Sequence, residues 1–324
     1  MSGNAGKSEI GDTGLFVSSI CFGTSGLGNM PDTYGYEVGE ERALNTIRAI
    51  FDSSVNFIDV SRNYGFGRSE ERIGKVVRER GGLPEGFVIS TKIDRDMSTN
   101  VLDGDRARRS AEESLAALGI EKFQLLHLHD PEYVADVNDV TGPGGAIETL
   151  FAMKEEGLVE AVGLAAGNVG IMTPLLEAWD FDALVTHNRF TMVNRNAERM
   201  INMAIDRGIA VLNAAPYSGG VLAKGSAQFK RYVYMDADET TLSPVQAVES
   251  IVDRYGVPLG AAALQFSMRD ERVTSTVCGV SKPERVQETL DWALIDIPDN
   301  CWDELGALQP STNDPESGRV YKPG

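Results

Sequence analysis

The chain alternates short apolar segments with amphipathic stretches, and this alternation limits the folds open to it more than any other feature. Eight segments have the length and composition of buried strands: Ile20–Phe22, Val55–Asp59, Phe87–Lys92, Phe123–His129, Val159–Leu164, Ala183–Asn188, Ile209–Ala214 and Val273–Val277. Helical spacing of apolar residues follows them in Glu40–Ser54, Ser69–Glu79, Asp105–Leu118, Gly145–Glu156, Met172–Ala178, Arg195–Arg207, Pro244–Tyr255, Leu259–Met268 and Pro283–Ala293. Strand-then-helix units in this number predict an α/β fold whose parallel strands close into a (β/α)8 TIM barrel.

A doubly wound parallel sheet is the alternative that the same alternation allows. Its dinucleotide-binding form carries GxGxxG directly after the first strand, and this chain has no such motif there. No linker or low-complexity tract divides residues 1–324, so we expect one domain. Long loops are predicted at Asp130–Gly144 and Phe229–Leu242, at the strand ends where barrels build active sites. We expect the polar tail Pro310–Gly324 either to be disordered or to fold over the barrel mouth.

Charge and cysteine content exclude several function classes. The 324 residues carry 30 basic and 48 acidic side chains, a net charge of −18 that would repel nucleic acid and anionic membranes. Three scattered cysteines, without a CxxC pair, favour neither a disulfide framework nor a thiolate metal site. The N-terminus lacks the apolar run of a signal peptide, and no apolar run is long enough to span a membrane. A cytoplasmic location is therefore expected.

Polar residues that terminate apolar strands are the candidates for chemistry. Asp59, Lys92 and His129 end three consecutive strand segments, and Tyr64 follows Asp59 by five residues. Parallel strand ends meet at one barrel mouth, so all four can converge there. A lysine cation would lower the pKa of the tyrosine, a carboxylate would orient the lysine, and a neutral histidine would donate to a substrate oxygen. This set suits proton transfer at a carbonyl beside a hydride donor.

The motifs around these residues resemble those of the aldo-keto reductase family over nearly the whole chain. The segments concerned are GLFVSSICFGTSGLG, IDVSRNYGFGRSEERIGK, VISTK, LLHLHDP and VTSTVCGVSKPERVQE. The resemblance implies a barrel with an N-terminal β-hairpin, a nicotinamide cofactor, and Asp59, Tyr64, Lys92 and His129 as the catalytic tetrad. The family's acid–base residue would then be Tyr64.

LHDPE and AVGLAAGN are similar to the aldose dehydrogenase branch, which includes D-threo-aldose, L-fucose and D-galactose dehydrogenases and pyridoxal 4-dehydrogenase. The resemblance implies oxidation of a sugar hemiacetal carbon to a lactone, with Tyr64 as the base and a role in carbohydrate metabolism. An NADPH-dependent aldehyde or ketone reductase and a pyridoxal dehydrogenase are the alternatives within the family. The expected partner is a small sugar or aldehyde.

Resemblance also assigns the cofactor residues. Gly167-Asn168 and Asn188 stand where the family holds the nicotinamide carboxamide, and Ala214 stands where some members stack a tyrosine. The loop Pro216–Leu222, with Tyr217, Ser218 and Gly220, would cover the pyrophosphate, and its glycines allow close backbone approach. At the adenosine end, Gly279 replaces a lysine directed at the 2′-phosphate, whereas Arg285 keeps the arginine position. Lys282 is a candidate to substitute for the lost lysine, with a solvated loop lysine as the alternative, and Ser281 is expected to bind the cofactor beside it. Because one cation is lost, either NAD or NADP is expected.

Two readings outside this chemistry stay open on the residues alone. His127 and His129 form an HxH pair on one strand face, as in barrel metal hydrolases, and His187 is the third histidine of the chain. The other reading of His127 is an interior residue beneath the site, and we assign no metal. A non-catalytic binding subunit is the third class, although that role requires no Asp–Tyr–Lys–His set.

Overall fold

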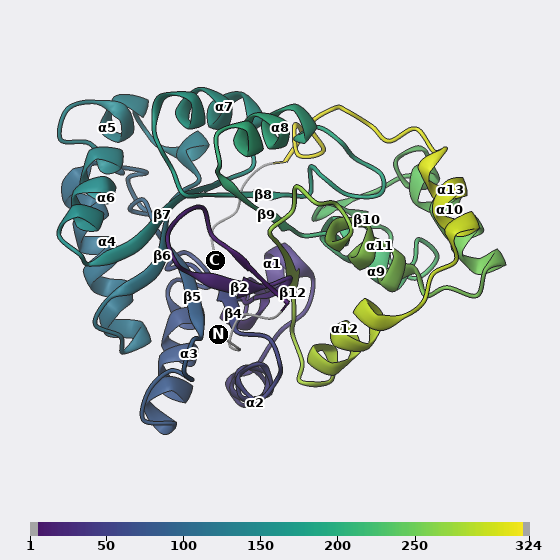
Figure 1. Ribbon diagram of the computed structural model, residues 1–324, viewed down its shortest axis with the longest axis horizontal. Helices are drawn as coiled ribbons and strands as arrows, with labels where there is room; N and C mark the ends of the chain where they lie inside the picture. Colours follow the sequence, from purple (N-terminus) through teal and green to yellow (C-terminus); the bar gives the residue numbers. More distant parts are fainter. Residues whose placement is uncertain (1–5, 320–324) are drawn as a thin grey trace.

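The computed structural model describes residues 6–319 and contains one closed barrel of eight parallel strands (Figure 1). The strands are β3 (Ile20–Gly23), β4 (Phe57–Asp59), β5 (Val88–Ile93), β6 (Phe123–His129), β7 (Val159–Ala166), β8 (Ala183–His187), β9 (Ala210–Ala214) and β12 (Ser275–Gly279). They follow one another around the barrel in chain order, and β12 closes it by pairing with both β9 and β3. This closure confirms the predicted (β/α)8 barrel and excludes the doubly wound sheet.

Helices surround the barrel, and all nine predicted helical stretches are present (Figure 1). They are α2 (Glu40–Phe51), α3 (Arg68–Glu79), α4 (Gly104–Leu118), α6 (Ala146–Glu155), α7 (Val169–Ala178), α8 (Glu198–Asp206), α10 (Glu239–Arg254), α11 (Leu259–Met268) and α12 (Glu284–Leu294). The additional helices are α1 (Pro31–Tyr34), α5 (Val137–Thr141), α9 (Val221–Lys224) and α13 (Asp299–Gly306). Both ends of α4 are fixed by capping residues. The Asp103 side chain accepts from the Arg106 amide at 2.7 Å at the N-terminus, and Gly119, whose φ is +70°, caps the C-terminus.

The predicted loop Phe229–Leu242 is only partly a loop. It contains the short antiparallel pair β10 (Arg231–Tyr232) and β11 (Met235–Asp236), and α10 already begins at Glu239. Asp238 caps α10 by accepting from the Thr241 amide at 2.8 Å, so the helix forms although it contains Pro244. The predicted loop Asp130–Gly144 likewise contains the short helix α5.

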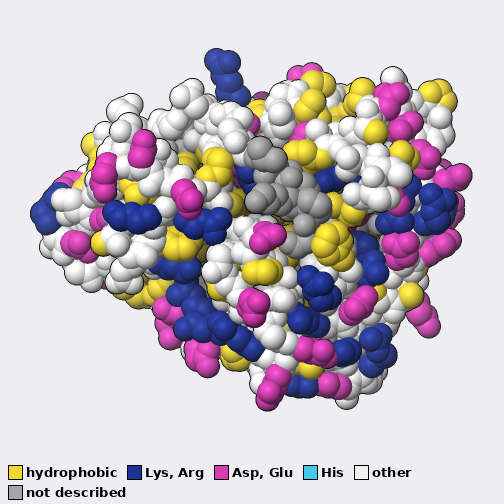
Figure 2. Space-filling view, turned by 180° about the vertical axis from the view of Figure 1, so that it is seen from behind, with side chains coloured by type: hydrophobic (Ala, Val, Ile, Leu, Met, Phe, Trp, Pro, Cys, Tyr) yellow, Lys and Arg dark blue, Asp and Glu magenta, His cyan; other side chains and the backbone are white. Residues whose placement is uncertain are grey.

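The predicted N-terminal hairpin consists of β1 (Lys7–Glu9) and β2 (Phe16–Ser18). It lies at the barrel end where the strands begin, because the Asn56 side chain, just before β4, donates to the Phe16 carbonyl at 2.9 Å. The carboxyl ends of the strands therefore remain available for a site at the opposite end. On the face shown in Figure 2, acidic and basic side chains are intermixed. No helix within residues 6–319 is long and apolar enough to cross a membrane.

Candidate active site

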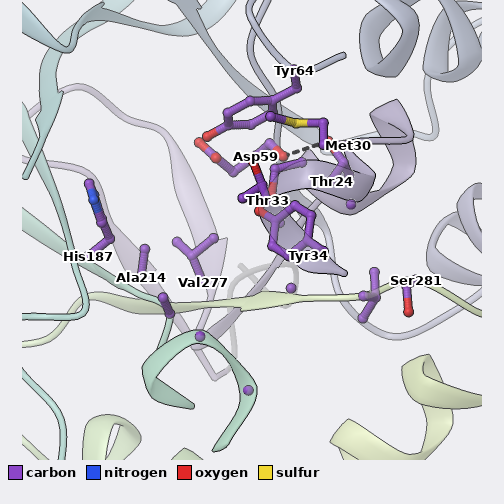
Figure 3. Close-up of a pocket in the computed structure, with 18 of the residues that line it drawn as sticks. Thr24, Met30, Thr33, Tyr34, Asp59, Tyr64, His187, Ala214, Val277 and Ser281 are labelled. Atoms are coloured by element: carbon purple, nitrogen blue, oxygen red, sulfur yellow. Dashed lines mark hydrogen bonds between the residues drawn. The ribbon is translucent and has the colours of Figure 1, made fainter. Parts of the chain in front are cut away.

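A cavity of about 590 Å3 opens at the carboxyl ends of the barrel strands. All four residues predicted for catalysis line it, and they come from β4, the loop after β4, β5 and β6. Figure 3 shows two of them, Asp59 and Tyr64, on one side of the cavity. The parallel register places Asp59 beside Ser90 and Lys92 beside His127 on neighbouring strands. The residues predicted from their positions at the ends of strands thus lie together in the folded chain.

Lys92 and Asp59 form a buried ion pair at the floor of the cavity. The Lys92 Nζ lies 2.9 Å from both Asp59 carboxylate oxygens and 2.6 Å from the Val60 carbonyl. Ser90 donates to Asp59 Oδ2 at 2.8 Å, and Thr24 donates to the Asp59 carbonyl, as the dashed line in Figure 3 marks. A buried charge pair is stable only when its remaining hydrogen-bonding groups are satisfied, and here they are. The Lys92 ammonium has three hydrogens and three acceptors.

Tyr64 lies over this pair, in a loop held close to the loop after β3. A Cβ added at Gly65, whose φ is +64°, would lie 2.0 Å from the Gly28 carbonyl oxygen, so this approach requires glycine. The Lys92 Nζ lies 5.0 Å from the Tyr64 ring centroid, and the Tyr64 hydroxyl makes no hydrogen bond to residues 6–319. Burial, followed by the Asp59 carboxylate, raises the pKa of Tyr64 well above its usual value.

This direction is opposite to the predicted lowering of the Tyr64 pKa by Lys92. The physical reason is that the Lys92 charge is neutralised by Asp59, so the phenol experiences burial and a nearby carboxylate more than a cation. At neutral pH the side chain is therefore a phenol in this structure.

His129 pairs with a carboxylate that the sequence analysis did not select. Its Nδ1 lies 2.5 Å from Asp94 Oδ1, and Ser61 donates to Asp94 Oδ2 at 2.7 Å. Burial alone would lower the pKa of His129, but the carboxylates of Asp130 and Asp94 outweigh it and raise that pKa. Asp94 directly follows β5, so the strand-end rule that selected Asp59 and Lys92 would also have found it.

His127 lies beneath the cavity and has a different partner from His129. Its Nε2 is 3.0 Å from Ser90 Oγ, and burial lowers its pKa well below the usual value. A Cβ at Gly163, its register partner on β7, would lie 2.1 Å from its Nδ1, so this glycine makes room for the ring. Between residues 6 and 319, no group of three or more His, Cys, Asp or Glu side chains could hold a metal ion. The interior reading of His127 is the one its contacts support.

Half of the residues predicted to bind the cofactor line the same cavity. They are Tyr217, Gly220, Gly279, Ser281, Lys282 and Arg285. Figure 3 shows Ser281 at the far side of the pocket from Tyr64, with Val277 and Ala214 along its floor. Arg285 forms an ion pair with Glu288 at 2.7 Å, so its charge is already partly balanced. This part of the cavity has the cations and glycine backbone suited to phosphate groups.

The other predicted cofactor residues, Gly167, Asn168, Asn188, Pro216, Ser218 and Leu222, are not among the residues that line it. The amides of Gly167 and Asn168 donate to the Glu132 carboxylate at 2.9 and 3.1 Å. Asn168 also caps α7 through its side chain, and Asn188 donates to Glu316 Oε1 at 2.7 Å. Pro216, Ser218 and Leu222 are buried behind the turn at Gly219 and Gly220.

The C-terminal segment is folded over the mouth of the barrel as far as residue 319. This is the second of the two outcomes predicted for the tail. Residues 320–324 lie outside the described residues. The Ser311 amide donates to the Val193 carbonyl at 3.0 Å. Glu316 is buried, 3.3 Å from His187 Nε2, and it also faces the guanidinium groups of Arg189 and Arg319. Burial opposes its ionisation, but His187 and these two arginines lower the pKa of Glu316. Arg319 lines the cavity.

Residues 19–309 match the sequence profile of the aldo/keto reductase family. The chain belongs to the aldo/keto reductase family. It is accordingly an NAD(P)-dependent oxidoreductase, and the basic end of its cavity fits such a cofactor.

This aldo/keto reductase is 29% identical to pyridoxal 4-dehydrogenase of Microbacterium luteolum, over 92% of this chain and 96% of that protein. It is 25% identical to D-threo-aldose 1-dehydrogenase of a Pseudomonas species, over 90% and 94% of the two chains. It is also 25% identical to L-galactose dehydrogenase of Arabidopsis thaliana, over 87% and 86%. Among solved structures, the holo form of aldo-keto reductase AKR11C1 from Bacillus halodurans superposes with a TM-score of 0.75 at 17% identity, covering 97% and 99% of the chains. These similarities match the aldose dehydrogenase branch.

Proposed function

We propose that this aldo/keto reductase oxidises the hemiacetal carbon of an aldose to a lactone, with Tyr64 as its acid–base residue. The observation that carries the proposal is the convergence of Asp59, Tyr64, Lys92 and His129 on one cavity at the carboxyl ends of the strands. The names of two relatives, D-threo-aldose 1-dehydrogenase and L-galactose dehydrogenase, support the sugar substrate. A role in carbohydrate metabolism and a cytoplasmic location belong to the same proposal.

The contacts in the cavity suggest a role for each of the four residues. NAD or NADP, when bound, would supply the hydride acceptor for the carbon that is oxidised. Tyr64 lines the cavity, and its hydroxyl has no hydrogen-bond partner within residues 6–319, so the hydroxyl is available to the substrate oxygen. Asp59 and Lys92 hold a fixed, paired charge beneath the ring, and His129 lies against its edge with ring centroids 6.0 Å apart. Fixed groups of this kind stabilise developing charge without reorganisation.

We also propose the predicted cofactor contacts at both ends of the cavity. Lys282 and Arg285 would contact the adenosine phosphate, and Gly220 leaves the backbone open to the pyrophosphate. The carboxamide contacts of Gly167, Asn168 and Asn188 require the chain to exchange its present hydrogen bonds to Glu132 and Glu316 for bonds to the cofactor.

Pyridoxal is a second candidate substrate, because pyridoxal 4-dehydrogenase is 29% identical to this chain. A screen of aldoses, aldehydes and pyridoxal, each with NAD and NADP and followed at about 340 nm in both directions, separates these candidates. Turnover of pyridoxal in preference to every aldose would replace the sugar proposal. Absence of any cofactor-dependent change in absorbance would refute both.

The role of Tyr64 is tested by the Tyr64→Phe variant. Loss of the hydroxyl should lower kcat by about 10²-fold or more, the contribution expected of general acid–base catalysis, while cofactor binding measured by fluorescence stays unchanged. Tyr255→Phe is the matched control, because the Tyr255 hydroxyl donates to Glu304 on the outer surface. A Tyr64→Phe enzyme that retained most of its kcat would show that another group handles the proton.

A further inference from the structure

A second cavity, separate from the active site, opens between the loop after β8 and the helices α11 and α13. Its volume is about 230 Å3, and it shares no lining residue with the catalytic cavity. Figure 1 shows α11 and α13 on the same side of the barrel. We call this cavity the arginine pocket after Arg195 and Arg269, the two cations that line it. The proposed function uses neither of them.

Apolar and aromatic side chains form part of the wall of the arginine pocket. Phe266 lies on α11, Trp302 and Leu305 lie on α13, and Met192 comes from the loop after β8. An apolar cavity of about 150 Å3 is large enough to hold benzene, so the larger arginine pocket has room for one aromatic ring with a small substituent. Pockets for drug-sized ligands begin at about 300 Å3, so a dinucleotide is too large for this one.

Both cations of the arginine pocket lie over aromatic rings and lack an acidic partner. The guanidinium carbon of Arg195 lies 4.1 Å from the centroid of the Phe266 ring, and that of Arg269 lies 4.3 Å from the centroid of the Trp302 ring. Within residues 6–319, the Arg195 side chain donates only to the Asn194 carbonyl, and the Arg269 side chain forms neither an ion pair nor a hydrogen bond. A guanidinium over a ring keeps its N–H donors at its edge, where they are available to an anion.

The arginine pocket is positively charged because the acidic groups near it are already paired. Asp270 lines the pocket, but Arg272 Nε and Nη2 donate to its two oxygens at 2.8 and 2.7 Å. Glu198, which also acts on the charge of Arg195, pairs with Arg272 at 3.4 Å. Burial lowers the pKa of Arg195 to about 10, so this side chain remains a cation at neutral pH. A partly buried cation without a carboxylate partner favours the binding of an anion.

We propose that the arginine pocket is a second ligand site of this protein and that it binds a small aromatic carboxylate. The carboxylate accepts hydrogen bonds from Arg195 and Arg269, and the ring packs against the apolar wall to which Phe266 and Leu305 contribute. The net charge of −18 repels anions from most of the surface, so an anion site on this chain needs local cations of this kind. The inference does not rest on the proposed oxidation, because the two cavities share no residue.

The arginine pocket lies where the C-terminal segment begins. Leu305 and Gly306, at the end of α13, line the pocket, and the chain continues from there toward the barrel mouth. The Arg195 amide donates to the Ser311 carbonyl at 2.7 Å, so the loop that supplies one cation also anchors this segment. A carboxylate bound in the pocket would therefore contact both the helix that precedes the segment and the loop that holds it.

The three tryptophans of the chain allow this proposal to be tested by NMR. Benzoate is titrated into the full chain labelled with 15N-tryptophan, and the indole N–H signals are assigned with Trp→Phe variants. Trp302 reports on the arginine pocket, Trp292 reports on the catalytic cavity through its contact with Tyr217, and Trp179 packs against Phe151 outside both. The Trp302 signal should move to saturation with a Kd on the order of 1 mM, as expected of a ligand with about nine non-hydrogen atoms. Benzyl alcohol, which has the ring without the charge, should bind at least about 10-fold more weakly.

Arg269→Gln and Arg195→Gln should each weaken benzoate binding by about 10-fold in the same titration. Because Arg269 is exposed, Arg269→Gln keeps the test decisive even if Arg195→Gln does not fold. Arg199→Gln is the matched control, since it removes the same charge from an exposed position on α8 outside the pocket and should leave the binding unchanged. No saturable movement of the Trp302 signal at about 20 mM benzoate would overturn the proposal. Equal affinity for benzyl alcohol, equal weakening by Arg199→Gln, or movement of the Trp292 signal alone would overturn it as well.

Discussion

Glu70 offers a quantitative test of the electrostatics beside the active site. It is fully buried on α3, where Thr91 donates to its Oε1 at 2.7 Å and Arg62 lies 3.5 Å from its Oε2. Burial exceeds the effect of these partners and raises the pKa of Glu70 to about 7. In the unfolded chain the same group would titrate near about 4.3. The folded protein therefore binds an extra proton between these values, and its stability falls as the pH rises through them.

The expected size follows from the two pKa values. A difference of two to three pKa units corresponds to about 3 kcal/mol of unfolding free energy lost between about pH 4 and pH 8, at about 1.4 kcal/mol per unit. Glu70→Gln removes the titration and keeps an acceptor for Thr91. The free energy of unfolding of this variant, minus that of the wild type, should thus increase by about 3 kcal/mol over that range.

Urea unfolding of both proteins at about pH 5 and pH 8 measures most of this change, and the contributions of other groups cancel in the difference. Glu71→Gln is the matched control, because it removes the same charge from the adjacent, largely exposed position. Its effect should stay within about 0.5 kcal/mol at both pH values. If Glu70→Gln differs from the wild type by the same amount at both pH values, the pKa of Glu70 is not raised and the reasoning fails.

Three further predictions concern packing and charge. Lys92→Met leaves the Asp59 carboxylate buried without its cation and should cost about 3–5 kcal/mol of unfolding free energy, measured by urea titration. An unchanged midpoint would contradict the buried pair. Gly163→Ala places a methyl group against the His127 ring and should cost about 1–3 kcal/mol in the same assay. Because the pKa of Glu316 is lowered, its ion pairs hold the C-terminal segment at neutral pH and weaken as the pH falls through that pKa. Glu316→Gln should accordingly speed hydrogen exchange at the amides of residues 311 and 195 at pH 7, and protection equal to the wild type would count against this role.

The strand ends were open to prediction because they obey a local rule. A polar residue that terminates a buried parallel strand has few positions available other than the barrel mouth, and Asp59, Lys92 and His129 all meet that condition. Asp94, directly after β5, meets the same condition, although it is not a member of the tetrad that the resemblance implies. Tyr64 lies in a loop, and only its motif identified it.

Hydrogen-bond partners were not open to prediction in this way. The charge of Lys92 is paired with the Asp59 carboxylate, so it does not lower the pKa of Tyr64, and this depends on a contact of 2.9 Å between side chains of two neighbouring strands. The C-terminal segment is similar: Glu316 pairs with His187, which precedes it by more than one hundred residues. No periodicity or spacing encodes such a contact.

The amino-acid sequence by itself determined the barrel and the strand-end residues that face its mouth, because strand burial and helix amphipathicity are local patterns that repeat around a closed sheet. The N-terminal hairpin was expected only from the family resemblance. The tertiary structure alone decided the burial of Tyr64 above the paired Lys92 and the partnership of His129 with Asp94. These depend on burial and on distances of a few ångströms between side chains from different strands, and Coulomb energies and hydrogen bonds change steeply over such distances.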